Sequence, residues 1–239
     1  MLKSGERYED LEYKGLEIIQ SEDGYRFTSD SVLVANLANV KRGDRVVDIG
    51  TGSGIIAILI AAKFSPSEVV GVEIQPRLAD MAARSVAHNG LEGVVKIVNS
   101  PAQGAEKIIG GGFDVVVTNP PYDENVSDKP ADEIQICKSE VCLTVADCVK
   151  TASRLIKYGG LFYMVNKARR MVDVVCSMRE NGIEPKKLYL IQPKKDKDVD
   201  TFIVEGKKGA KPSVVLPKPI VIYDDDGNFT DFSRRLYNK

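Results

Sequence analysis

The stretch "VVDIGTGSGIIA", residues 46–57, decides the fold that this sequence predicts. Its branched apolar start has the composition of a buried strand, and the apolar run that closes it continues to residue 64, a helical length. Between the two stand Gly50, Gly52 and Gly54. Glycine permits a tight turn and a close approach of the backbone to a ligand. We therefore predict a strand, a ligand-binding turn and a helix.

The same alternation of strand and helix continues towards the C-terminus. Further strands are expected at residues 68–74, 94–98, 113–119 and 161–166, and further helices at residues 76–90, 102–109, 140–160 and 169–182. Residues 186–193 and 201–208 are expected to pair as an antiparallel ribbon. Because such alternation builds a mostly parallel sheet with helices on both faces, we predict an α/β, Rossmann-like fold of seven strands with an antiparallel last strand.

The whole chain is predicted to form a single domain. Residues 1–40 would contribute one or two short strands and a helix, and residues 41–206 hold the alternating core. Residues 207–239 form an extension, in which "VIYDDDGNFT" (221–230) predicts a hairpin around its Asp-Gly turn.

An acidic residue follows the glycine turn at the end of the next predicted strand. The second strand of the alternation ends at Glu73, and a carboxylate there suits the paired hydroxyls of a ribose. The glycine spacing is G-x-G-x-G rather than the G-x-G-x-x-G of dinucleotide folds, and Asp48 stands two residues before the first glycine. This pattern favours S-adenosylmethionine over NAD as the ligand.

The stretch "VVVTNPPYDEN", residues 115–125, predicts a stiff corner at the end of a buried strand. Pro120 and Pro121 fix their own φ angles and cannot donate backbone hydrogen bonds. They also push Asn119 towards an extended conformation. The corner therefore holds the Asn119 carboxamide and the Tyr122 ring rigidly.

Taken in this order, "DIGTGSG" (48–54), "VEI" (72–74) and "TNPPY" (118–122) resemble the class I S-adenosylmethionine-dependent methyltransferases of the branch that modifies amino nitrogens. Two further stretches, "YRFTSDSVLVANL" (25–37) and "RLIKYGGLFYMVNKARR" (154–170), resemble the bacterial tRNA1(Val) adenine-37 N6-methyltransferases more narrowly. The resemblance covers roughly residues 7–239.

This resemblance implies a cofactor site and a target-base site. The cofactor residues would be Asp48, Gly50, Gly52, Gly54 and Glu73, and the catalytic residues Asn119, Pro120, Pro121 and Tyr122. An aromatic amine is a poor nucleophile because its lone pair is delocalised into the ring. Hydrogen bonds to the Asn119 side-chain oxygen and the Pro120 carbonyl would localise that lone pair, while Tyr122 would stack on the base.

Two stretches depart from the family pattern. Where relatives have an acidic residue that contacts the cofactor adenine, this chain has Pro101, and Ser100, Asn99 or a backbone group could substitute. We include Ser100 among the predicted cofactor residues, with Asp30, which either approaches the methionine end of the cofactor or caps a helix. The Arg-His-Glu segment of many relatives is replaced by "CKSE" (137–140).

Charge is unevenly divided along the chain. Residues 1–149 carry 14 Lys+Arg against 23 Asp+Glu, and residues 150–239 carry 19 against 11. A basic half indicates a polyanionic partner, although the same lysines could simply solvate an ordinary surface. We predict tRNA as the partner, with RNA contacts from Arg169, Arg170, Lys194 and Lys195.

Composition excludes several other classes. No apolar run approaches the ~20 residues that span a bilayer, and the N-terminus lacks the apolar core of a signal peptide. We therefore expect a cytoplasmic protein with no membrane partner. The cysteines have no CxxC spacing and His88 is the only histidine, so we expect reduced thiols and no metal. No pattern specifies an oligomeric state.

Three alternative functions share these motifs. A glutamine-N5 protein methyltransferase uses the same corner, but its usual N-terminal helical domain is missing because only about 40 residues precede the glycine strand. A DNA adenine methyltransferase commonly needs a separate target-recognition domain, and no segment of adequate size is free. The third is a catalytically degenerate fold that binds RNA without turnover.

Overall fold

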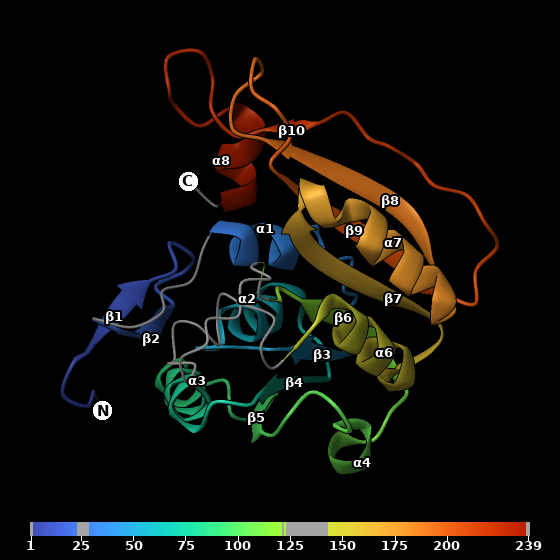
Figure 1. Cartoon of the computed structure of the whole chain (residues 1–239). Helices are drawn as coiled ribbons and strands as arrows, with labels where there is room; N and C mark the ends of the chain where they lie inside the picture. The colour runs from blue at the N-terminus through green and yellow to red at the C-terminus, as the bar shows by residue number, and fades with distance from the viewer. Residues whose placement is uncertain (1, 23–28, 121, 123–142, 238–239) are drawn as a thin grey trace, which may run out of the picture.

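The computed structural model describes residues 2–22, 29–120, 122 and 143–237. Its centre is an eight-stranded sheet in the order β10-β8-β9-β7-β6-β3-β4-β5 (Figure 1). The strands are β3 (Arg45–Ile49), β4 (Glu68–Glu73), β5 (Val95–Asn99), β6 (Phe113–Thr118), β7 (Ile156–Lys167), β8 (Ile183–Gln192), β9 (Thr201–Lys208) and β10 (Ile220–Val221).

The pairing of these strands confirms the predicted architecture. β9 runs antiparallel to both of its neighbours, β7 and β8, while the other adjacent pairs of this sheet are parallel. The prediction of seven strands misses β10, which the C-terminal extension adds beside β8. Two residues are too few to show a strand period, and β10 forms because the edge of β8 offers unpaired backbone groups.

Helices cover both faces of the sheet (Figure 1). They are α1 (Ser29–Leu37), α2 (Ile55–Phe64), α3 (Pro76–His88), α4 (Glu106–Ile109), α6 (Val145–Leu155), α7 (Met171–Glu180), α8 (Asp231–Tyr237) and the 3-10 turn η1 (Ala168–Arg170). Residues of α1, α2 and α8 share one apolar core with Val46, and residues of α6 and α7 share another with Val47. Successive strand residues thus face opposite cores.

The helix predicted at residues 140–160 is shorter than expected at its C-terminal end. It begins in a capping box, in which the Thr144 hydroxyl oxygen accepts from the Asp147 amide at 3.1 Å. It ends at Leu155, and β7 starts at the next residue. Gly160 therefore does not stop a helix. A Cβ there would lie 2.7 Å from Ile156 Cγ1, so this glycine allows close packing within β7.

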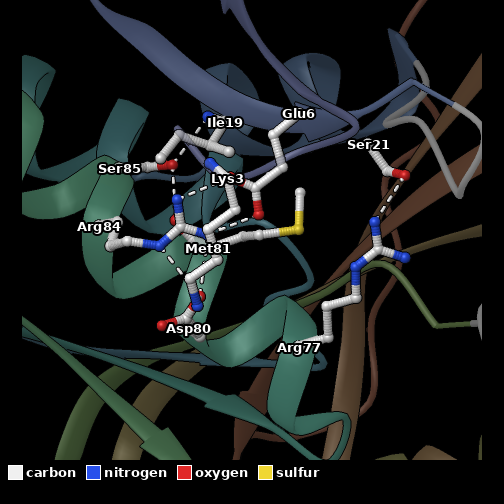
Figure 2. A network of polar contacts seen from close by, with 9 residues as sticks. All are labelled: Lys3, Glu6, Ile19, Ser21, Arg77, Asp80, Met81, Arg84 and Ser85. Atoms are coloured by element: carbon white, nitrogen blue, oxygen red, sulfur yellow. Dashed lines mark hydrogen bonds and ion pairs between the residues drawn. The ribbon is translucent and has the colours of Figure 1, made fainter. Parts of the chain in front are cut away.

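The first strands predicted by the sequence form a separate hairpin. β1 (Glu6–Asp10) and β2 (Glu17–Ser21) pair antiparallel and lie against α3. Figure 2 shows the contacts: Arg84 of α3 donates to both Glu6 carboxylate oxygens at 2.7 and 2.8 Å, and the Ile19 amide donates to Ser85 Oγ at 2.9 Å. The Arg84 guanidinium holds the pKa of Glu6 below its usual range.

The C-terminal extension packs beside β8 and α1 (Figure 1). Its predicted turn is present, because the Asp224 amide donates to the Asn228 carbonyl at 2.8 Å. Tyr223 and Phe229 also form an isolated antiparallel β-bridge. The helix α8 that follows was not expected from the sequence. Within the described ranges, no helix is long and apolar enough to cross a membrane.

We expect Arg84→Ala to destabilise the protein by ~1.5–3 kcal/mol at pH 7, because it leaves the Glu6 carboxylate, whose side chain is 3% exposed, without its cation. Since the folded-state pKa of Glu6 is depressed, the ion pair stabilises the fold above the usual carboxyl pKa and loses its effect as pH falls through the folded value. Urea unfolding at pH 7 and at pH 3 measures both effects.

Arg154→Ala is the matched control for this prediction. Arg154 also pairs with a glutamate, Glu106, but its own side chain is 51% exposed. An exposed pair of this kind contributes ~0–1 kcal/mol. Equal losses in the two variants would contradict the role of the Arg84–Glu6 pair in anchoring the hairpin.

Candidate functional site

The glycine turn joins β3 to α2 and is held against the end of β4. Gly50, Gly52 and Gly54 all have positive φ, at 71°, 57° and 93°. The amides of Gly50 and Thr51 donate to the Val72 carbonyl at 2.9 and 3.0 Å. A Cβ on Gly54 would lie 3.2 Å from the Ala82 Cβ. The turn therefore needs glycine both for its backbone conformation and for its contact with α3.

Glu73 lies beside this turn, as predicted. The residue is 5% exposed, its Oε2 accepts from the Gly52 amide at 2.9 Å, and its Oε1 accepts from the Gln75 amide at 2.9 Å. Each carboxylate oxygen can accept more than one hydrogen bond. The same carboxylate can therefore order the turn and accept from the hydroxyls of a ribose.

Asp48 lies beneath the turn and is fully buried. The Thr51 hydroxyl donates to its Oδ2 at 2.5 Å. Burial raises the pKa of Asp48 to about 7, and the nearby Glu73 charge adds to the rise. The structure thus gives Asp48 a role in ordering the turn, while its predicted contact with the cofactor stays a prediction.

Ser100 borders the same end of the sheet. It is 7% exposed, and its amide donates to the Glu73 carbonyl at 2.9 Å. A small cavity beside Gly50 is lined by Ser100, Glu73 and Leu143, whereas Pro101 is exposed. Of the two residues, only Ser100 lines this cavity, and its predicted contact with the cofactor stays a prediction.

The Asn-Pro-Pro-Tyr corner leaves the sheet next to the glycine turn. Ile49 and Thr118 are paired in register, and the Thr118 hydroxyl donates to the Ile49 carbonyl at 2.9 Å. Because β3 and β6 are parallel neighbours, Gly50 and Asn119 follow at the same edge. Pro120 is buried, and Pro121 lies outside the described residues.

The Asn119 carboxamide is oriented by two hydroxyls. Its Nδ2 donates to Ser31 Oγ at 2.9 Å, and its Oδ1 accepts from the Tyr122 hydroxyl. That hydroxyl also lies 3.1 Å from Asp30 Oδ2. Ser31 was missed by the sequence analysis, although the three polar residues that open this apolar helix indicate a position that faces polar groups. Asp30 contacts the corner, and its predicted cofactor contact stays a prediction.

The predicted RNA residues lie near the carboxyl ends of β7 and β8. Arg169 donates to the Tyr122 carbonyl at 3.1 Å, and Lys194 donates to the Asp225 carbonyl at 3.3 Å. Lys195 is exposed. Arg170 is the most covered, with a side chain 11% exposed that pairs with Asp173 at 2.8 Å.

A buried contact ties the N-terminal hairpin to the glycine turn. Gln20 of β2 is 1% exposed, and its Nε2 donates to Ser53 Oγ at 2.6 Å. Ser53 stands between Gly52 and Gly54 and is 5% exposed. The hairpin therefore supports the turn through a contact that is separate from those with β4. No local pattern in "EIIQS" predicts this contact.

Comparisons with known proteins agree with this geometry. A family model described as the methyltransferase small domain matches residues 26–180. The tRNA1(Val) (adenine(37)-N6)-methyltransferase of Bacteroides thetaiotaomicron is 27% identical over 159 residues, 65% of each chain. That of Dyadobacter fermentans is 22% identical over 219 residues, 90% of this chain and 89% of the relative. The match thus spans just under two thirds of the first relative's length.

Solved structures show the same fold. The crystal structure of a predicted O-methyltransferase from Agrobacterium tumefaciens superposes with a TM-score of 0.73 at 21% identity, covering 87% of this chain and 95% of that one. These matches confirm the predicted resemblance to Rossmann-like class I methyltransferases, whose methyl donor is S-adenosylmethionine.

We expect Asp48→Asn to become more stabilising, or less destabilising, relative to wild type as pH rises from 4 to 8. The folded-state pKa of Asp48 is raised to about 7, so folding opposes its ionisation. Wild type loses stability as pH rises from the unfolded pKa to the folded one, and asparagine does not titrate. Thermal unfolding without cofactor at pH 4, 6 and 8 measures the difference, and a constant difference would exclude the effect.

We expect Gln20→Ala to weaken binding of S-adenosylhomocysteine by ~2- to 10-fold, because the lost buried hydrogen bond contributes ~0.5–1.5 kcal/mol and no longer fixes Ser53 in the turn. Titration calorimetry measures the affinity. Ser85→Ala is the matched control, since it removes the hydrogen bond to the Ile19 amide and leaves Gln20 and Ser53 in place. Equal affinities of the two variants would mean that Gln20 acts on stability alone.

Proposed function

Because the chain belongs to the methyltransferase small domain family, we propose that it transfers the methyl group of S-adenosylmethionine to the exocyclic amine, N6, of an adenine in tRNA. The observation that carries this proposal is the Asn119 carboxamide, held by Ser31 and Tyr122 beside the glycine turn. A fixed amide oxygen at that edge is what a planar amine needs in order to react.

The cofactor residues would act by holding the methyl donor still. Glu73 would accept from the ribose hydroxyls, and the backbone of Gly50 and Gly52 would lie against the methionine part. When bound, the sulfonium supplies an activated methyl group, so the protein mainly positions the reactants and stabilises charge.

The target amine would bind at Asn119 Oδ1. The Tyr122 hydroxyl now donates to that oxygen, and it lies 3.1 Å from a second acceptor, Asp30 Oδ2. The hydroxyl can therefore turn to Asp30 when the amine takes its place on Asn119. A hydrogen bond that strengthens as the nitrogen becomes tetrahedral lowers the barrier without tightening ground-state binding.

Two features support tRNA as the substrate. The relatives that cover most of this chain are named for a tRNA adenine. Basic side chains also surround the corner: the Lys167 ammonium lies 5.4 Å from the centre of the Tyr122 ring, and Arg169 donates to the Tyr122 carbonyl. Cations at these positions would neutralise backbone phosphates around a base bound at Tyr122.

The test is methylation of tRNA from a strain that lacks the protein. Purified protein and S-adenosylmethionine are expected to produce N6-methyladenosine, detected by mass spectrometry of nucleosides. We expect Asn119→Ala to lower kcat by ~10²-fold with nearly unchanged affinity for S-adenosylhomocysteine. Tyr122→Ala should raise KM through lost stacking, and Tyr122→Phe should keep most of the activity.

Ser31→Ala is the control for a merely structural role of Asn119. It removes the hydrogen bond that the Asn119 amide nitrogen donates but keeps the acceptor oxygen of Asn119. Its activity should fall less than that of Asn119→Ala at a similar melting temperature. Full turnover by a folded Asn119→Ala protein would contradict the role of the amide. Methylation of a glutamine peptide or of DNA, without methylation of tRNA, would contradict the assignment of tRNA as the substrate.

A further inference from the structure

A cavity of about 400 Å³ lies next to the Asn-Pro-Pro-Tyr corner and is separate from the glycine turn. Its walls come from the end of β1, the start of α1, the end of β8, the start of β9 and the C-terminal extension. Asp30 connects the cavity with the corner, because it lines the cavity and its Oδ2 lies 3.1 Å from the Tyr122 hydroxyl. The volume falls within the ~300–1,000 Å³ of small-molecule sites.

One wall of the cavity is aromatic. Tyr223, Phe229 and Tyr237 all line it, and their ring centres follow one another at 5.1 and 5.4 Å. Tyr223 stands at the end of this row and is 38% exposed. The lining also includes the aliphatic side chains of Leu33 and Ile191. A flat ring in this cavity would therefore find both aromatic and aliphatic surfaces.

The polar side chains of the cavity are carboxylates, which accept hydrogen bonds, and hydroxyls, which both donate and accept. Among the described residues, its lining includes Glu9, Asp10, Asp30 and Asp200 but no lysine or arginine. Each of these four carboxylates already has at least one partner, and one partner of Asp200 is Lys167 at 2.6 Å. Carboxylate oxygens accept hydrogen bonds and repel phosphate. The interior thus favours a ligand with N–H groups and disfavours an anion.

Basic side chains adjoin lining residues of the cavity instead. Lys194 follows Pro193, a lining residue, and Lys167 reaches the cavity from β7 through its pair with Asp200. A nucleotide has the complementary arrangement, with a flat base that carries donors and a phosphate at the other end. The cavity is therefore suited to a base placed inward with its backbone near these basic side chains.

We propose that this cavity binds a nucleobase of the RNA directly beside the target adenine, with its ring on Tyr223 and its N–H donors towards the carboxylates. The proposal rests on the proposed function. The target amine itself must reach Asn119 next to the glycine turn, whereas this cavity lies beyond Asp30, towards β8 and the C-terminal extension. Uracil, with two carbonyl acceptors and one N–H, fits this lining worst.

The test uses an RNA stem-loop that contains the target adenine, with 2-aminopurine placed on its 5′ or its 3′ side. Stacking on a tyrosine quenches 2-aminopurine fluorescence. We expect wild type to quench the probe at one of the two positions, and Tyr223→Ala to lose the quench and bind about 10-fold more weakly, as for one lost base stack. Tyr223→Phe should retain both.

Tyr158→Ala is the matched control. Tyr158 is 80% exposed and lies near the start of β7, away from the carboxyl ends of the strands. Its removal should change neither the quench nor the affinity. Replacing the quenched neighbour by uracil should weaken binding to wild type and leave Tyr223→Ala nearly unaffected.

Two results would overturn the proposal while leaving the proposed function intact. The first is N6-methyladenosine formation with no Tyr223-dependent quench at either neighbour. The second is a Tyr223-dependent quench only when 2-aminopurine replaces the target adenine, which would make the cavity the target-base pocket. Absence of both methylation and RNA binding by wild type would refute the proposed function first, and the cavity proposal with it.

Discussion

The parallel pairing of β3 with β4 on one side and β6 on the other is the constraint on which the site depends. In register, Ile49 faces Val72 and Thr118. Three chain segments therefore leave the sheet at one edge: the glycine turn, Glu73 and the Asn-Pro-Pro-Tyr corner. A one-residue slip in either pairing would turn the side chains of a strand to the opposite face and would separate the turn from Glu73 or from Asn119.

Buried polar groups then hold these segments in place. Thr51 and Asp48 are hydrogen-bonded to each other within the glycine turn, Glu73 accepts from the Gly52 amide, and Gln20 donates to Ser53. Because a buried polar group costs free energy unless it is hydrogen-bonded, each contact restricts the turn to one conformation. The raised pKa of Asp48 is a consequence of that burial. Burial of the Asp48 carboxyl thus lowers the stability of the fold at the place where the cofactor turn has to be rigid.

Much of the fold could be predicted because its signals are local. Alternating strands and helices are recognised from runs of apolar residues and from the turns between them. The helix at residues 140–160 was predicted too long because a glycine pair after an amphipathic run is the usual signal of a helix end. Here the backbone had already left the helix, since β7 pairs with β6 at Ile156 and again from Leu161.

The sequence by itself determined the class of fold, the glycine turn with Glu73, and the corner with Asn119 and Tyr122. Each of these features is specified by a pattern of residues that are close together in the sequence. Tertiary structure decided what supports them. Ser31 and Asn119 are 88 residues apart, and Gln20 and Ser53 are 33 apart. A single side-chain hydrogen bond between distant segments leaves no period and no turn residue in the sequence. The same holds for the cavity, whose walls meet only when the C-terminal extension packs beside α1 and β8.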